Sequence, residues 1–214
     1  MEYQVSADKP WFKFWPEGVP EQLDYPEIPL FRLLSRAAEM WPESIAFSCR
    51  EKRLSYSELD GLTNKLAAGL HNLGVKKGDK VTIFLNNSLE FIIGYYGILK
   101  AGGTVTLANP LFRQMELEHH LNDTVAMAIV TNSYLCPLVK EVQAQTKLKI
   151  IIATDVERDG GIIPLGKILN NYPPTSPKFS TKPREDVAVI VYTGGTTAHH
   201  LLLFSQSLRD TPPQ

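Results

Sequence analysis

The chain has 214 residues, of which 43% are hydrophobic and 21% are charged. These proportions are close to those of soluble globular proteins and exclude an intrinsically disordered chain. Lys and Arg together number 22 and Asp and Glu number 23, which gives a formal net charge of -1. This balance excludes the strongly basic surface that general nucleic-acid binders and binders of anionic membranes use.

Cysteine usage and the apolar segments indicate the compartment. Cys49 and Cys136 lie far apart, and neither belongs to a CxxC or Cys/His cluster. We therefore expect two reduced cysteines and neither a disulfide framework nor a zinc site. The N-terminus lacks the pattern of a secretory signal. The most apolar stretch, Phe91–Leu99, is shorter than the about 20 residues that span a bilayer. These features predict a cytoplasmic protein without a transmembrane segment.

The first 29 residues are rich in proline and aromatic residues. Dense proline disfavours both helices and strands, so residues 1–29 are predicted to form an extended arm whose aromatic side chains pack onto a larger body. A short helix is expected next, because Leu30, Leu33, Leu34, Ala37 and Ala38 recur at helical spacing. Trp41-Pro42 is expected to end it.

A strand, a turn and a capped helix follow. We predict a strand at Ile45–Cys49 and a charged turn at Arg50–Arg53. Ser55 and Glu58 have the spacing of a capping box, and a leucine stripe behind them extends the helix to Leu73. Gly74 occupies the position of a left-handed C-cap.

From there, strands and helices alternate. Strands are predicted at Val81–Leu85, Thr104–Leu107, Ala126–Val130, Lys149–Ala153 and Asp186–Tyr192, and helices at residues 89–101 after a Ser88 cap, at Met115–Leu121, and from a Ser133 cap to Gln145. Residues 155–186 are predicted to be a loop-rich connection. The strands are continuous apolar runs, which is typical of buried parallel strands. The fold class is therefore α/β: a doubly wound, mainly parallel sheet with helices on both faces.

One loop carries a chemical signal. Thr193-Gly194-Gly195-Thr196-Thr197 directly follows the last predicted strand, at the end of a sheet strand where α/β proteins bind ligands. Glycine lets backbone N–H groups approach an anion, and threonine adds hydroxyl donors. The residues alone leave two interpretations open: a phosphate-binding loop, or an ordinary Gly/Thr turn between strands.

Several motifs resemble one family in an ordered series. Residues 192–197 resemble the opening of the phosphate loop of AMP-forming acyl-CoA synthetases, the adenylate-forming superfamily that includes 4-coumarate–CoA ligases and firefly luciferase. Further segments that resemble the family are Trp41–Phe47, Leu54–Leu59, Gly74–Val81, Gly97–Gly103 and Asn109-Pro110. The resemblance covers residues 30–197. The aromatic arm and the Leu-rich start favour the branch of the family that uses medium- and long-chain fatty acids.

The resemblance implies a two-step reaction. A fatty or other carboxylic acid attacks the α-phosphate of ATP to give an acyl-adenylate and pyrophosphate, and the thiol of CoA then displaces AMP. ATP, Mg²⁺ and CoA are the implied cofactors. By match to the family loop, Thr193, Gly194, Gly195, Thr196 and Thr197 would hold the terminal phosphates. The resemblance assigns no catalytic residue and no metal ligand within this chain.

The sequence departs from the family after Thr197. Where the family loop continues with a glycine and then a lysine, this chain has Ala198-His199-His200-Leu201-Leu202. We therefore expect residues 30–197 to be the N-terminal part of a synthetase domain. Residues 198–214 are expected to be a divergent, irregular tail from splicing, a frame shift or a gene-model error.

Loss of the lysine and of the remaining domain implies that this chain has no measurable ligase activity. The alternative is a non-catalytic remnant or splice product that binds a protein partner, or aggregates, through exposed apolar surface.

Other candidate residues have ordinary structural explanations. The pairs His119-His120 and His199-His200 are expected at the surface or at an interface rather than at a metal. Glu116, Glu118 and Asp123 are expected on a solvated helix face rather than in an acid/base pair. Asn86-Asn87-Ser88 is expected to cap a helix, with lining of the acyl or CoA site as the alternative. Tyr95 and Tyr96 are expected in the core. No Walker A, GxGxxG or GxSxG pattern occurs.

Overall fold

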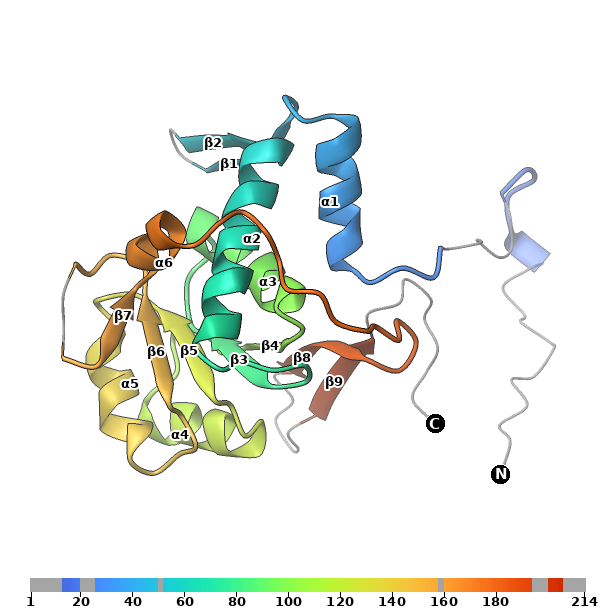
Figure 1. Cartoon of the computed structure of the whole chain (residues 1–214). Coiled ribbons are helices and arrows are strands. Elements are labelled where there is room, and N and C mark those ends of the chain that lie inside the picture. The colour runs from blue at the N-terminus through green and yellow to red at the C-terminus, as the bar shows by residue number, and fades with distance from the viewer. Residues whose placement is uncertain (1–12, 20–25, 50–51, 158–159, 194–199, 206–214) are drawn as a thin grey trace.

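A parallel sheet forms the centre of the fold (Figure 1). The computed structural model describes residues 13–19, 26–49, 52–157, 160–193 and 200–205. Within these ranges the sheet has seven strands in the order β7-β6-β5-β3-β4-β8-β9. The first six are mutually parallel, and β9 pairs antiparallel with β8. The strands are β3 (Lys80–Ile83), β4 (Thr104–Leu107), β5 (Ala128–Thr131), β6 (Ile150–Ala153), β7 (Ile162–Pro164), β8 (Val187–Thr193) and β9 (His200–Ser205).

Helices cover both faces of this sheet (Figure 1). On one face lie α1 (Phe31–Met40), α2 (Tyr56–Asn72), α3 (Leu89–Lys100) and α6 (Leu165–Asn171); on the other lie α4 (Gln114–Asp123) and α5 (Cys136–Gln143). Side chains that alternate along the strands pack against the helices on opposite faces of the sheet. Val81 and Ile83 belong to the cluster with α2 and α3, whereas Phe84 and Ile129 belong to the cluster with α4 and α5. The predicted α/β, doubly wound architecture is confirmed.

A small hairpin precedes α2. β1 (Ile45–Cys49) pairs antiparallel with β2 (Lys52–Ser55), so Lys52 and Arg53 lie in a strand rather than in the predicted turn. Both side chains are exposed. The hairpin strand therefore lacks the apolar pattern by which a buried strand is identified from sequence.

Serine capping was predicted correctly at two helices and wrongly at one. The Ser55 hydroxyl accepts from the Glu58 N–H, and the Glu58 carboxylate accepts from the Ser55 N–H. The Ser88 hydroxyl accepts from the Phe91 N–H at 3.2 Å. Ser133 does not cap α5, because its N–H and hydroxyl both donate to the Asp155 carboxylate, 22 residues away.

Three short elements and the arm differ from the predictions. β7 and α6 lie within the stretch predicted to be loop, and β9 lies where an irregular tail was expected. β7 has three residues and α6 seven, too few to show a clear periodicity. In the described part of the arm, Phe14 is 86% and Trp15 40% exposed. The predicted packing of the arm's aromatics onto the body is therefore wrong for these two.

Candidate functional site

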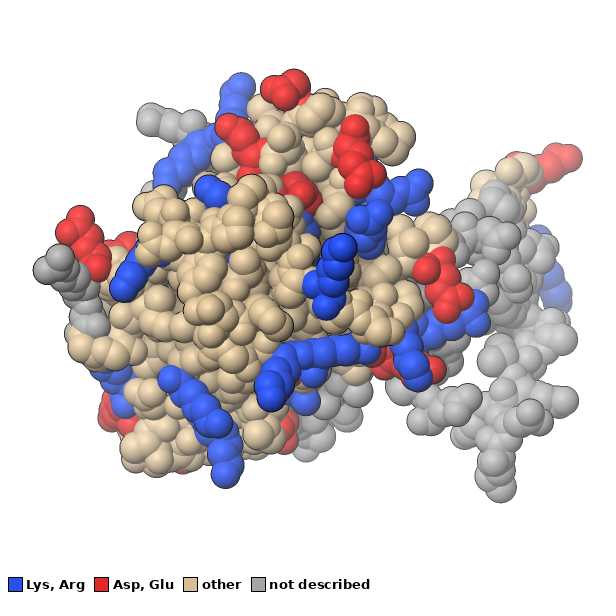
Figure 2. All heavy atoms as spheres, viewed as in Figure 1, with Lys and Arg blue, Asp and Glu red and all other residues tan. Residues whose placement is uncertain are grey.

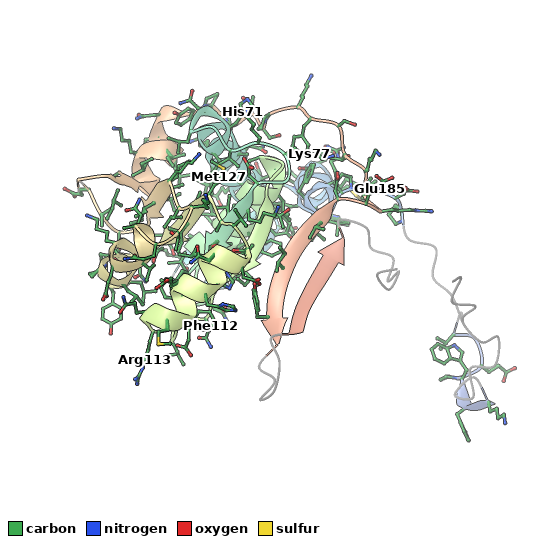
Figure 3. The ribbon with its side chains drawn as sticks, turned by 90° about the horizontal axis from the view of Figure 1, so that it is seen from below. His71, Lys77, Phe112, Arg113, Met127 and Glu185 are labelled. Carbon is green, nitrogen blue, oxygen red and sulfur yellow. The ribbon has the colours of Figure 1, made fainter. Side chains whose placement is uncertain are left out.

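The carboxyl edge of the sheet is the place where folds of this topology bind ligands. The chain leaves β3 toward α3 on one face and leaves the neighbouring β4 toward α4 on the other. Neighbouring strands whose connections diverge in this way open a ligand-binding crevice at their carboxyl ends. β8 runs parallel to β4 and ends at the same edge. In Figure 3, Phe112 and Arg113, which precede α4, lie at this end of the molecule, opposite Lys77 and Glu185.

The predicted phosphate loop begins at this edge. Thr193 is the last residue of β8. Gly194, Gly195, Thr196 and Thr197 lie outside the described residues. Their role as phosphate ligands stays a prediction, and the structure describes only the strand that leads into it.

Tyr192, the residue before the loop, is held by α4. Its hydroxyl donates a hydrogen bond to the Asp123 carboxylate. Its ring packs against the His120 ring, with centroids 5.0 Å apart and an interplanar angle of 55°. Burial and the Asp123 carboxylate both raise the pKa of the Tyr192 phenol, so it stays protonated and able to donate.

His120 is buried, at 2% exposure, which overturns the expected surface position. Its Nε2 lies 3.3 Å from the Thr106 hydroxyl, which is 2.7 Å from the Thr82 hydroxyl. Burial lowers the pKa of His120 to about 4, so its imidazole is neutral at pH 7. Nδ1 is buried without a hydrogen-bond partner among the residues that the structure describes.

The sequence carried a signal for this burial. Leu117, His120, Leu121 and Thr124 recur every three or four residues, and all four are buried in the structure. The adjacent pair His119-His120 suggests a metal site instead. His119 is exposed, and the side chains of His199 and His200 lie outside the described part of the structure. Within the described ranges no group of three or more His, Cys, Asp or Glu residues could hold a metal ion.

Two acidic residues of α4, Glu116 and Asp123, have hydrogen-bond partners. The Glu116 carboxylate accepts from the Arg113 N–H at 2.7 Å and so helps to cap the helix. Asp123 binds Tyr192. Two of the three carboxylates considered as an acid/base pair are thus engaged in structural contacts.

A hollow lies at the carboxyl end of β3. It has a volume of about 530 Å³ and is lined by Cys49, Lys52 and residues 86–90. Asn86 and Asn87 are exposed here, and Ser88 has the predicted capping role. Lys52 and Glu90 face one another across 3.8 Å. Cys49 is half-buried and Cys136 is buried.

Tyr95 and Tyr96 pack against the buried cluster on the α2–α3 face. Their rings contact edge to face, with centroids 5.5 Å apart. Burial raises the pKa of Tyr95 to about 12. Both side chains are half-buried at the edge of the core, so the predicted core position is met only in part. In the part of the chain that the structure describes, no helix has the length and apolarity to cross a membrane.

Comparison with known proteins gives a consistent result. The family described as AMP-binding enzyme matches residues 34–199. A long-chain-fatty-acid–CoA ligase from Bacillus subtilis is 30% identical over 90% of this chain and 39% of its own length. A crotonobetaine/carnitine–CoA ligase from Escherichia fergusonii is 32% identical over 75% of this chain and 33% of its own.

Solved structures agree in fold. A long-chain-fatty-acid–CoA ligase from Archaeoglobus fulgidus superposes with a TM-score of 0.79 and 28% identity, over 90% of this chain and 39% of that one. The chain thus spans about two fifths of the length of this structure and of the Bacillus relative. Because the family match extends over most of its residues, the chain belongs to the AMP-binding enzymes, the family of the acyl-CoA ligases that it resembles.

Proposed function

We propose that this chain is the N-terminal part of an AMP-forming acyl-CoA synthetase and contributes the phosphate-binding loop to ATP and pyrophosphate. One observation carries the proposal: β8 ends beside the β3/β4 divergence of the sheet, and the family match continues through the loop that follows it. Long-chain fatty acids are the proposed substrate class, since relatives named as long-chain-fatty-acid ligases match most of the chain.

Thr193, Gly194, Gly195, Thr196 and Thr197 are the proposed phosphate ligands. Their N–H and hydroxyl groups would stabilise the negative charge that accumulates on pyrophosphate as it leaves. ATP would enter as its magnesium complex, with the metal between phosphate oxygens. In the complete reaction of the family, the acid would react with ATP in the first step and CoA would react with the acyl-adenylate in the second. We place the protein in the cytoplasm because its two cysteines, Cys49 and Cys136, lie far apart in the sequence and do not form the framework typical of a disulfide-rich secreted protein.

Phosphate binding is testable by calorimetric titration of the 214-residue chain with ATP and with pyrophosphate. We expect saturable binding of both. Replacing Thr196 and Thr197 together by Ala should weaken pyrophosphate binding at least tenfold, because a hydrogen bond to a charged group contributes about 1.5–3 kcal/mol. Thr175→Ala, at an exposed threonine of a connecting loop, is the matched control. Absence of binding, or equal affinity in all three proteins, would contradict the proposal.

Turnover is a separate question. Residues 198–214 contain no lysine, so the point charge that the family loop supplies to the phosphates is missing. We therefore expect this chain to bind pyrophosphate but to release none from ATP and a long-chain fatty acid. Pyrophosphate release by the purified chain would overturn this part of the proposal.

A second candidate is a non-catalytic role in protein association. Leu111, in the loop before α4, and Met115, in the first turn of α4, are 84% and 83% exposed. Large exposed apolar side chains are typical of protein interaction sites. If this role holds, the chain should self-associate in sedimentation experiments, Leu111→Ser with Met115→Ser should abolish the association, and ATP should not bind.

A further inference from the structure

We propose that His120 and Asp123 are positioning residues that fix the start of the phosphate loop by holding Tyr192. The inference rests on the proposed phosphate-binding function and names residues that do not touch the nucleotide. Tyr192 lies immediately before Thr193 on β8. α4 follows β4, the strand that pairs with β8, and Figure 3 shows it in front of the sheet near the end of β8.

Two contacts of different kinds hold the Tyr192 side chain. His120 and Asp123 are three residues apart on α4, which places them on the same face of the helix. His120 packs against the ring of Tyr192, and Asp123 accepts the hydrogen bond from its hydroxyl. A ring contact alone permits sliding, and a hydrogen bond alone permits rotation about the hydroxyl. Together they define both the position and the tilt of the ring.

His120 is itself fixed from inside the sheet. Its Nε2 contacts Thr106 of β4, whose hydroxyl meets that of Thr82 on β3. The chain of contacts therefore runs from β3 and β4, through His120 of α4, to Tyr192, the residue before the loop. Thr106 of β4 and Ile190 of β8 are partners in the register of these two paired strands. The contacts from Thr106 through His120 to Tyr192 therefore join β4 to its neighbouring strand, β8.

A histidine at position 120 lowers the stability of the fold, so stability does not explain its presence there. Its neighbours on the same helix face, Leu117 and Leu121, are fully buried and apolar. Nδ1 of His120 is buried with no hydrogen-bond partner in the described part of the chain, and a buried polar atom in that state costs about 1–3 kcal/mol. A leucine would avoid this cost, so the imidazole at this position is better explained by its contacts with Thr106 and Tyr192.

Anchoring Tyr192 should matter for affinity. A loop that binds an anion through its backbone loses conformational freedom on binding, and a loop whose first residue is already fixed loses less. We therefore expect weaker phosphate binding when the contacts of His120 and Asp123 with Tyr192 are removed, although the proposal places none of these three side chains against the phosphate.

The test is calorimetric titration of the full 214-residue chain with inorganic pyrophosphate. Tyr192→Phe keeps the ring and removes the hydroxyl, and it should lower affinity about threefold. Tyr192→Leu removes both contacts and should lower it about tenfold. Asp123→Ala removes the acceptor and should match Tyr192→Phe, and the double variant should be no weaker than either single one, because both remove the same hydrogen bond. Glu118→Gln, an equal change of charge elsewhere on α4, is the control and should bind as the wild type does.

A spectroscopic signature separates positioning from a general effect on stability. In a protein with ¹⁵N-labelled histidine, pyrophosphate should shift the His120 imidazole signals in the wild type, and the shift should vanish in Tyr192→Leu. Equal pyrophosphate affinity in wild type and variants, or unmoved His120 signals, would overturn the inference and leave the proposed function intact. If the wild type binds no pyrophosphate, the proposed function falls and this inference falls with it.

Discussion

Lys100 of α3 and Asp60 of α2 form an ion pair inside the helical layer, with Nζ 2.6 Å from Oδ1. The lysine side chain is 1% exposed and the aspartate side chain 19%. Lys100 also donates to the Asn64 amide oxygen at 2.8 Å, and the Ser35 hydroxyl of α1 donates to the same aspartate. The cluster therefore joins three helices through one buried charge. Burial lowers the pKa of Lys100, and this effect outweighs the opposing influence of Asp60.

The two halves of this pair should differ in their importance for stability. Asp60→Asn leaves an ammonium group inside the protein without its counter-charge, and it should destabilise the fold by about 3–5 kcal/mol. Lys100→Met keeps an aliphatic chain of similar length. The remaining carboxylate is partly solvated and keeps Ser35 and Asn64, so the loss should be about 1 kcal/mol. Urea unfolding at pH 7 measures both, and equal losses would show that the burial asymmetry is unimportant.

His120 should make stability depend on pH in a defined window. Its pKa is about 4 in the folded chain and 6.5 in the unfolded one. Between these values the unfolded state binds more protons, so stability falls as the pH is lowered from 6.5 to about 4. The contribution is fully present above pH 6.5, and its loss amounts to about 3 kcal/mol at most.

His120→Gln removes this titration while retaining an amide that can meet Thr106. The difference in unfolding free energy between wild type and variant should therefore change across pH 4–6.5 and stay constant above pH 7. His119→Gln, at the exposed neighbour, should give curves parallel to those of the wild type. Parallel curves for His120→Gln would contradict the burial that the structure assigns to this ring.

The elements that the sequence predicted well are those with many residues in one pattern. The leucine stripe of α2 and the apolar strands β3, β4, β5, β6 and β8 carry their burial in their own composition. Ser55 and Ser88 were predictable as caps because each hydrogen bond joins residues three apart in sequence. The doubly wound topology followed from the alternation of these elements.

The candidate site depended on contacts between distant residues. The approach of Asp123 and Tyr192 joins residues 69 apart, and no local pattern encodes it. The wrong prediction of a cap at Ser133 has the same cause. The Ser133 hydroxyl donates to Asp155, which lies 22 residues away in the sequence, instead of capping α5. The phosphate loop stays a prediction from its composition and its family resemblance, while the contacts of α4 with Tyr192 depend on the packing of a helix on the sheet.

The ends of α2 and α4 offer a comparison within one protein. Gly74 follows α2 with φ +96° and donates to the His71 carbonyl, while Val75 donates to Leu70. Val125 follows α4 with the same pattern, donating to Asn122, and has φ +51°. This left-handed conformation costs a β-branched residue about 1–2 kcal/mol, whereas glycine adopts it freely.

Val125→Gly should therefore stabilise the chain, although it removes a side chain. The greater entropy of glycine in the unfolded state offsets about 0.5–1 kcal/mol of the relief, so the net gain should be about 0.5–1 kcal/mol. Val125 is 57% exposed, and little packing is lost. Val125→Ala keeps a Cβ atom and should gain less than glycine. Thermal unfolding of the two variants measures the difference, and a lower melting temperature for Val125→Gly would refute the strain at this C-cap.

Gly97 lies where α3 packs closely against α2. A Cβ atom on Gly97 would lie 2.7 Å from Cδ2 and 2.9 Å from Cγ of Leu66, which is itself fully buried. Gly97→Ala should therefore force the helices apart and destabilise the chain by about 1–3 kcal/mol, despite the higher helix propensity of alanine.

Gly61 of α2 is the matched control, because a Cβ atom added there would meet nothing within 4 Å. Gly61→Ala should instead stabilise the chain by about 0.5–1 kcal/mol. The two variants share one chemical change in two helices that pack together, and urea unfolding should move their midpoints in opposite directions. A common direction would mean that helix propensity, and not the contact with Leu66, governs this interface.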